Sequence, residues 1–168
     1  MKKTMSPQML KQIKSFWKWF EQNEMQILEA FTTNTKHDEV FNQLNRKLSY
    51  VSKRIGFILV GRKSNTEKVK LIITAHGYKK LFPKVIALGD TAPKLEHFTI
   101  HTFIKPLTPD NKHILPSFIS IAMQQVFIKL EDYNTATKKV VLIIYVPESL
   151  EKFNLSFLIY FTLGEVNF

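Results

Sequence analysis

The chain has 168 residues and a formal net charge of +10, with 45% apolar, 23% charged and 12% aromatic residues. A disordered chain would contain fewer apolar residues, and this length suffices for one domain with a sizeable core. The chain contains no cysteine, which excludes disulfides, thiolate catalysis and cysteine–zinc sites. We therefore expect a single domain over residues 1–168.

No targeting or membrane-spanning segment is expected. The first four residues, 1–4, carry positive charge, but the apolar stretch that a signal peptide needs does not follow them. The longest strongly apolar run, residues 140–146, is far shorter than the roughly 20 residues that cross a bilayer. These features favour a cytoplasmic protein.

The positive charge is concentrated in residues 46–84, where eleven Lys and Arg residues accompany one acid, Glu67. A field of this sign attracts phosphates, nucleic acid, anionic lipid headgroups or an acidic protein face. Surface lysines also keep proteins in solution without any partner, and the sequence leaves both interpretations open. The candidate partner-binding or anion-binding residues are Arg46, Lys47, Lys53, Arg54, Lys68, Lys70, His76, Lys79 and Lys80.

The N-terminal segment predicts an amphipathic helix. Ser6 and Pro7 favour a helix start, because serine caps helices and proline suits the first helical position. Two later residues disobey the apolar stripe: Trp19 points away from it and Glu24 points into it. Either the helix breaks at Asn23 and its register resets, which we favour, or a carboxylate faces the core and needs a partner.

A second helix is predicted over residues 36–52, with its basic residues on the outward half. The hydrophobic period then becomes strand-like, and residues 55–61 and 68–75 predict a β-hairpin. Gly77 ends the second strand, and a third helix follows with Pro83 in its first turn. We expect Gly89-Asp90 and Pro93 to end this helix. Its predicted apolar face consists of Tyr78, Leu81, Phe82, Val85, Ile86 and Leu88.

The C-terminal half is predicted to be mainly β-structure. Residues 97–104 predict a strand, whereas residues 118–133 fit a helix or strands. We favour strands, because a turn at 134–137 connects this segment to the apolar run 140–146. The last segment, 148–162, predicts a helix that is apolar almost all round, as is typical of a helix buried on two sides or covering a partner.

This order of elements predicts an α+β domain. Hairpins dominate over strand–helix–strand units, which favours antiparallel pairing. We expect an antiparallel sheet of about five strands with helices packed mainly on one face.

The sequence contains no recognised catalytic motif. There is no G-x-S-x-G segment and no glycine-rich phosphate loop. His97 and His101 would lie about 13 Å apart on a strand, too far for one ion, so we expect no metal site and no cofactor. His76, Lys79 and Lys80 flank a strand end and a helix start, where free N–H groups attract anions. Such turns are also ordinary connections in α+β domains.

Three short motifs carry a resemblance: W-x-W-F-x-x-N-E at 17–24, G-x-x-x-L-F-P at 77–83 and L-G-E at 163–165. Together they resemble a group of small bacterial proteins of uncharacterised function. The similarity covers most of the chain and implies an α+β domain with no assigned chemistry.

Proteins of that group continue beyond L-G-E with a further strand, whereas this sequence stops at Phe168, so we expect a strand to start near Val166. The resemblance also raises Asn23, Glu24 and Glu165 as candidates for a pocket or interface.

Three functional hypotheses follow. The first is a non-catalytic binding module whose basic face at 46–84 engages an acidic protein partner, with an adaptor or immunity-type role by analogy of class. Exposure of Trp19 would favour it, because tryptophan anchors protein interfaces. The second is salt-sensitive, non-specific nucleic-acid binding by the same face. The third is a small enzyme with at least two of Glu24, Glu165 and His76 around a pocket. The sequence identifies neither the partner nor the oligomeric state.

Overall fold

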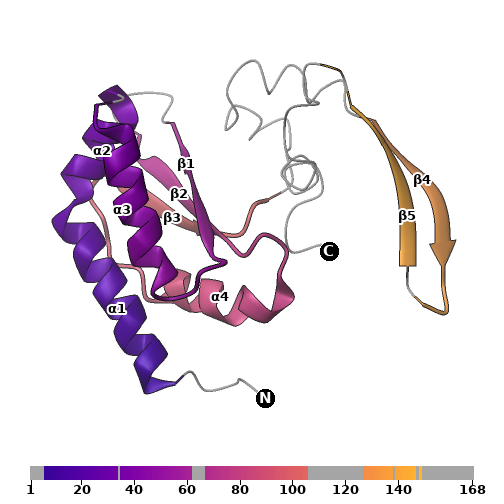
Figure 1. Ribbon diagram of the computed structural model, residues 1–168, viewed down its shortest axis with the longest axis horizontal. Helices are drawn as coiled ribbons and strands as arrows, with labels where there is room; N and C mark the ends of the chain where they lie inside the picture. Colours follow the sequence, from indigo (N-terminus) through magenta and orange to yellow (C-terminus); the bar gives the residue numbers. More distant parts are fainter. Residues whose placement is uncertain are drawn as a thin grey trace.

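The computed structural model describes residues 6–33, 35–61, 67–105, 127–137, 139–146 and 148. Over these ranges the chain combines helices with strands, which confirms the α+β class (Figure 1). The predicted helix at 148–162, apart from Glu148, and the strand start at Val166 lie outside the described residues. The elements in chain order are α1 (Pro7–Gln22), α2 (Glu24–Thr33), α3 (His37–Ser49), β1 (Gly56–Val60), β2 (Val69–Thr74), the 3₁₀ helix η1 (Lys79–Leu81), α4 (Phe82–Asp90), β3 (Phe98–Thr102), β4 (Phe127–Asn134) and β5 (Lys139–Tyr145).

Helix α1 begins and ends where its local chemistry predicts. The Ser6 hydroxyl accepts a 3.3 Å hydrogen bond from the backbone N–H of Met9, and Pro7 occupies the first turn. At the other end, the side-chain amide of Asn23 donates to the carbonyl oxygen of Trp19 at 2.7 Å. The backbone of Asn23 leaves the helical region, with φ −116° and ψ 13°. The predicted break is thus confirmed, and α2 starts with a new register.

The described strands form two sheets, so the expected single sheet of about five strands was wrong. The first has the order β1-β2-β3 and the second pairs β4 with β5. Strand β2 runs antiparallel to β1, with Phe57 opposite Ile73, but parallel to β3, with Val69 opposite Phe98. The parallel pair arises because η1 and α4 lie between the two strands, and a helical crossover returns the chain in the same direction.

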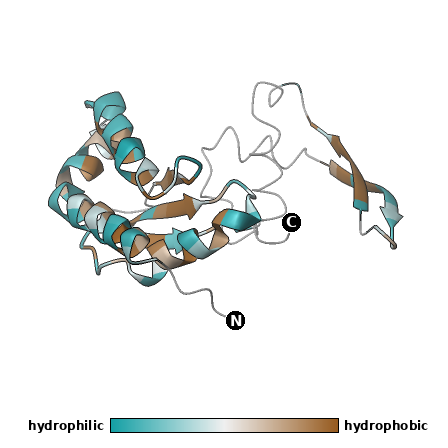
Figure 2. Cartoon of the chain, turned by 60° about the horizontal axis from the view of Figure 1, so that its bottom comes forward, coloured by the Kyte–Doolittle hydropathy of each residue, from teal (hydrophilic) through white to brown (hydrophobic). Residues whose placement is uncertain are grey.

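The core lies between one face of the three-stranded sheet and the helices, which are teal on one side and brown on the other (Figure 2). The ring of Phe20 in α1 meets the ring of Phe98 in β3 edge-on at 5.3 Å. The buried indole Nε1 of Trp17 donates a 3.0 Å hydrogen bond to the carbonyl oxygen of Leu88 in α4. Alternation along β2 places one set of side chains in this core, namely Val69, Leu71 and Ile73.

The third predicted helix is a 3₁₀ turn followed by α4. Pro83 lies in the first turn of α4, as predicted. Tyr78 and Ile86 do not share the buried face and are 51% and 46% exposed. The 3₁₀ turn has three residues per turn instead of 3.6, which shifts the phase of the apolar pattern. Gly89 lies inside α4 next to Thr102 of β3, where it permits a close helix–strand approach.

Strands β4 and β5 form the hairpin favoured for this part of the sequence, around the turn at 135–137. Residues 118–126 of the predicted segment 118–133 lie outside the described residues. Glu131 is an extra residue in β4, because Leu130 pairs with Leu142 and Asp132 pairs with the next residue of β5, Val141. This bulge shifts the alternation of side chains. One face of the hairpin is consequently apolar at every paired position, with Ile128, Leu130, Tyr133, Val140, Leu142 and Ile144.

Candidate functional site

Two loops meet at one end of the three-stranded sheet. Gly56, the first residue of β1, pairs with Thr74, the last residue of β2. The chain entering β1 and the chain leaving β2 are therefore neighbours. The guanidinium carbon of Arg54, in the loop before β1, lies 5.3 Å from the centre of the Tyr78 ring, in the loop after β2. This cation–π contact connects the two loops.

A tight turn orients the second loop. His76 and Gly77 have positive φ values of 49° and 73°, and the backbone N–H of Tyr78 donates to the carbonyl oxygen of Ala75 at 3.0 Å. Glycine adopts this backbone region without steric cost, and the Thr74 hydroxyl supports the turn by accepting from the backbone N–H of His76 at 3.0 Å. The turn reverses the chain directly before η1, which begins with Lys79 and Lys80.

We call the resulting surface the basic end. Its members are exposed, and the ion pairs among the described residues involve none of them. Because no described acid neutralises these cations at short range, their field extends into solvent. The basic end consists of Lys53, Arg54, Tyr78, Lys79 and Lys80.

Two other candidate cations lie elsewhere. Lys68 precedes the start of β2, at the opposite end of that strand, roughly 20 Å away at about 3.3 Å per residue. Its ammonium group donates to the carbonyl oxygen of Leu95 at 2.7 Å. Lys70 lies on the sheet face opposite the core. The pKa of His101 is lowered mainly by burial, and the charges of Lys70 and Lys105 lower it further. The cations of residues 46–84 therefore do not form one surface, because Lys68 and Lys70 lie away from the basic end.

Arg46 and Lys47 occupy the last turn of α3. Arg46 is exposed, whereas the ammonium of Lys47 lies 5.8 Å from the centre of the Trp19 ring. Trp19 itself is half-buried against the core, so it is not the exposed anchor that would have favoured a protein partner.

The remaining candidates have structural roles or are separated. Asn23 ends α1, and Glu24 accepts a 2.6 Å hydrogen bond from the backbone N–H of His97. Glu24 therefore lies near the start of β3, whereas His76 follows the end of β2. Because β2 and β3 run parallel, these are opposite ends of the sheet. Glu165 lies outside the described residues, and the described part of the chain holds no group of three potential metal ligands.

Sequence reasoning missed a groove between α1 and the end of α3. Its volume is about 490 Å³. Lys11 lines it from α1 and Lys47 from α3, and Tyr50, which is 60% exposed, lines it beyond the end of α3. The side chains that line this α1/α3 groove are Gln8, Lys11, Gln12, Ser15, Lys47 and Tyr50.

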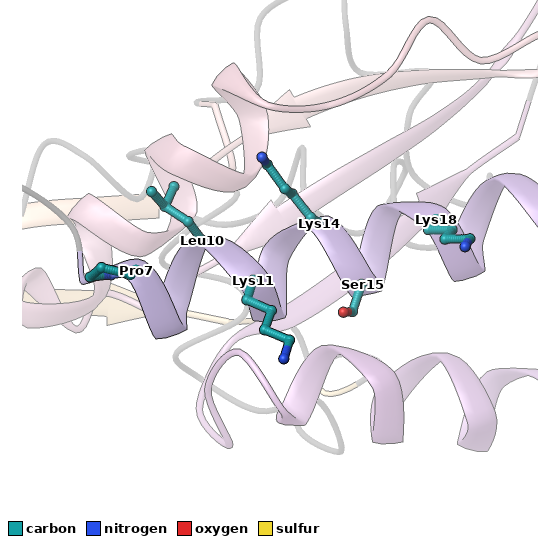
Figure 3. Close-up of a pocket in the computed structure, with 6 residues that line it drawn as sticks. All are labelled: Pro7, Leu10, Lys11, Lys14, Ser15 and Lys18. Atoms are coloured by element: carbon teal, nitrogen blue, oxygen red, sulfur yellow. The ribbon is translucent and has the colours of Figure 1, made fainter.

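A second shallow groove of about 480 Å³ runs along the outer surface of α1. Lys11 and Ser15 leave the helix on the opposite side from Leu10 and Lys14 (Figure 3). The helical spacing of Lys11, Lys14 and Lys18, outside the apolar stripe, was the signal that could have revealed this charge. It lay outside the segment with the highest charge density.

No described helix is both long and apolar enough to cross a membrane. Comparison of the chain with protein-family models, curated proteins and solved structures returned no match.

Proposed function

We propose that this protein is a non-catalytic binding module whose basic end engages an acidic surface of a protein partner. The contact between Arg54 and Tyr78 carries the proposal, because it joins two loops that each bear exposed cations. Arginine and tyrosine are, with tryptophan, the residue types enriched among those that dominate binding energy at protein interfaces. Lys53, Lys79 and Lys80 surround this pair as a charged rim, which would accelerate association with an acidic partner and select against basic ones.

A charge-reversal experiment tests this function. The variant Lys53→Glu/Lys79→Glu/Lys80→Glu leaves the Arg54–Tyr78 contact intact. The control Lys36→Glu/Lys94→Glu/Lys139→Glu makes the same change in net charge at exposed lysines elsewhere. Partners cross-linked by the wild type and by the control, but not by the basic-end variant, would support the proposal. Capture of the same partners by all three proteins would contradict it.

A second candidate function is binding of single-stranded nucleic acid. Two exposed tyrosines favour it, Tyr50 and Tyr78, because aromatic side chains among cations serve as stacking platforms for bases. Its test is a labelled oligonucleotide titrated at increasing salt. Affinity that falls steeply with salt and is lost in the basic-end variant, in the absence of any protein partner, would replace the first proposal by this one.

A further inference from the structure

The α1/α3 groove continues the basic end along the chain. Tyr50 lines the groove, and three residues later Lys53 begins the basic end. We propose that this groove receives an extended acidic segment of the protein partner. The inference rests on the proposed function and specifies how the partner continues beyond the basic end.

Hydrogen-bonding groups on α1 match the repeat of an extended peptide. Gln8 and Gln12 are four residues apart on one wall, a rise of about 6 Å along the helix. Side chains on one side of an extended chain repeat every two residues, at about 6.6 Å. The two amides can therefore bond successive peptide groups of one extended segment, and the Ser15 hydroxyl continues the row.

The charges in the groove select for carboxylates. Lys11 projects from α1 and Lys47 from α3, so an extended chain between them meets an ammonium group on each side. The ring of Trp19 near the Lys47 ammonium limits the positions of that side chain, which lowers the entropy lost when an ion pair forms. Acidic side chains on two successive positions would point to opposite walls.

The composition of the groove argues against other occupants. Apart from Tyr50, every residue that lines it ends in a polar or charged group, and none is a large aliphatic residue of the kind that receives an amphipathic helix. Three of its six side chains are neutral hydrogen-bonding groups and two are cations. A nucleic-acid channel usually presents a denser row of cations with several stacking rings. An acidic peptide would use both the two cations and the three neutral hydrogen-bonding groups.

Fluorescence anisotropy of labelled octapeptides with the full-length protein tests the inference. The probe is an octapeptide of two Glu-Glu-Ser-Ser repeats, which presents carboxylates on both sides of an extended chain, compared with one of two Gln-Gln-Ser-Ser repeats. Measurements at physiological salt screen charges more than about 8 Å away. We expect tighter binding of the Glu peptide and a loss of about tenfold in Lys11→Glu/Lys47→Glu.

Two further variants separate charge from hydrogen bonding. Gln8→Ala/Gln12→Ala keeps all charges and should weaken binding about threefold or more, because it removes the amide row. The control Lys36→Glu/Lys94→Glu repeats the charge change of the lysine variant at distant exposed positions and should bind like the wild type. Circular dichroism spectra establish that all variants are folded.

Several outcomes would overturn the inference. Equal binding of the Glu and Gln peptides would do so, as would wild-type affinity in both groove variants. Tighter binding of oligo(dT) of equal charge, lost in Lys11→Glu/Lys47→Glu, would assign the groove to nucleic acid instead. The two proposals fail separately: loss of partner capture in the basic-end variant, with wild-type peptide affinity in both groove variants, would remove only this inference. Peptide binding that depends on the groove, with partner capture unaffected by the basic-end variant, would remove only the proposed function.

Discussion

The carboxylate of Glu24 accepts a 2.6 Å hydrogen bond from the backbone N–H of His97, 73 residues later in the sequence. Glu24 is the first residue of α2, and His97 immediately precedes β3. The helix breaks at Asn23, which is the interpretation that the sequence favoured. The carboxylate of Glu24 is half-buried, and a backbone N–H partners it.

Removal of this carboxylate should destabilise the fold. Glu24→Ala leaves the His97 N–H without its acceptor, and we expect the free energy of unfolding to fall by about 1–3 kcal/mol. Glu24→Gln retains an acceptor oxygen and should cost less. Urea denaturation measures the stability of both variants, and Glu21→Ala, at an exposed position, is the control. Equal losses of stability in Glu24→Ala and in the control would contradict a structural role for the Glu24 carboxylate.

The Trp17 indole should contribute more to stability than the Trp19 indole. Trp17→Phe removes the buried hydrogen bond to the carbonyl oxygen of Leu88 and leaves a cavity beside α4. We expect a loss of about 1–3 kcal/mol in the free energy of unfolding. Trp19→Phe, at a half-buried position, should cost less than about 1 kcal/mol. Thermal or urea unfolding of both variants measures the two losses. A larger loss in Trp19→Phe than in Trp17→Phe would show that the hydrogen bond to Leu88 is not important.

Gly89 provides a test in which helix propensity and packing predict opposite signs. Propensity alone predicts that Gly89→Ala stabilises α4 by up to about 1 kcal/mol. The added Cβ would, however, clash with Cγ2 of Thr102, a β-branched side chain whose rotation is restricted. We expect a net loss of about 1–3 kcal/mol.

A double-mutant cycle identifies the cause of that loss. Thr102→Ser removes the methyl group that the new Cβ would meet, so Gly89→Ala should be much less damaging in the Thr102→Ser background. Denaturant midpoints of the four proteins measure the coupling. A stabilising Gly89→Ala, or additive effects, would show that the close approach of α4 to β3 does not require glycine.

His101 should make stability depend on pH on the acid side. Burial, followed by the charges of Lys70 and Lys105, lowers the pKa of His101 from 6.5. The unfolded chain therefore binds the proton more readily than the folded chain. The stabilisation is complete above about pH 6.5 and is lost as the pH falls toward and through the lowered pKa.

The variant His101→Gln removes this titration. The fall in urea midpoint between about pH 7.5 and about pH 5 should be smaller in the variant than in the wild type. Asn42→Gln, an exposed substitution in α3 that leaves every titratable group in place, serves as the control. The same fall in all three proteins would exclude His101 as its source.

The candidate site was predictable only in part. Charge density along the chain singled out Lys53 and Lys79, which the structure brings to the same end of the sheet. The same criterion included Lys68, whose ammonium instead meets the carbonyl oxygen of Leu95. It missed Lys11, because this residue lies outside the basic segment and reaches the α1/α3 groove only through the packing of two helices.

The sequence by itself determined the features that depend on neighbours within about one helical turn. Ser6 and Pro7 start α1, Asn23 ends it, and alternation places the buried face of β2, because caps and side-chain periods are local properties of the backbone. Tertiary structure alone decided the parallel pairing of β2 with β3 and the meeting of Arg54 with Tyr78. These relationships join residues more than 20 positions apart, and their geometry depends on how the intervening helices pack.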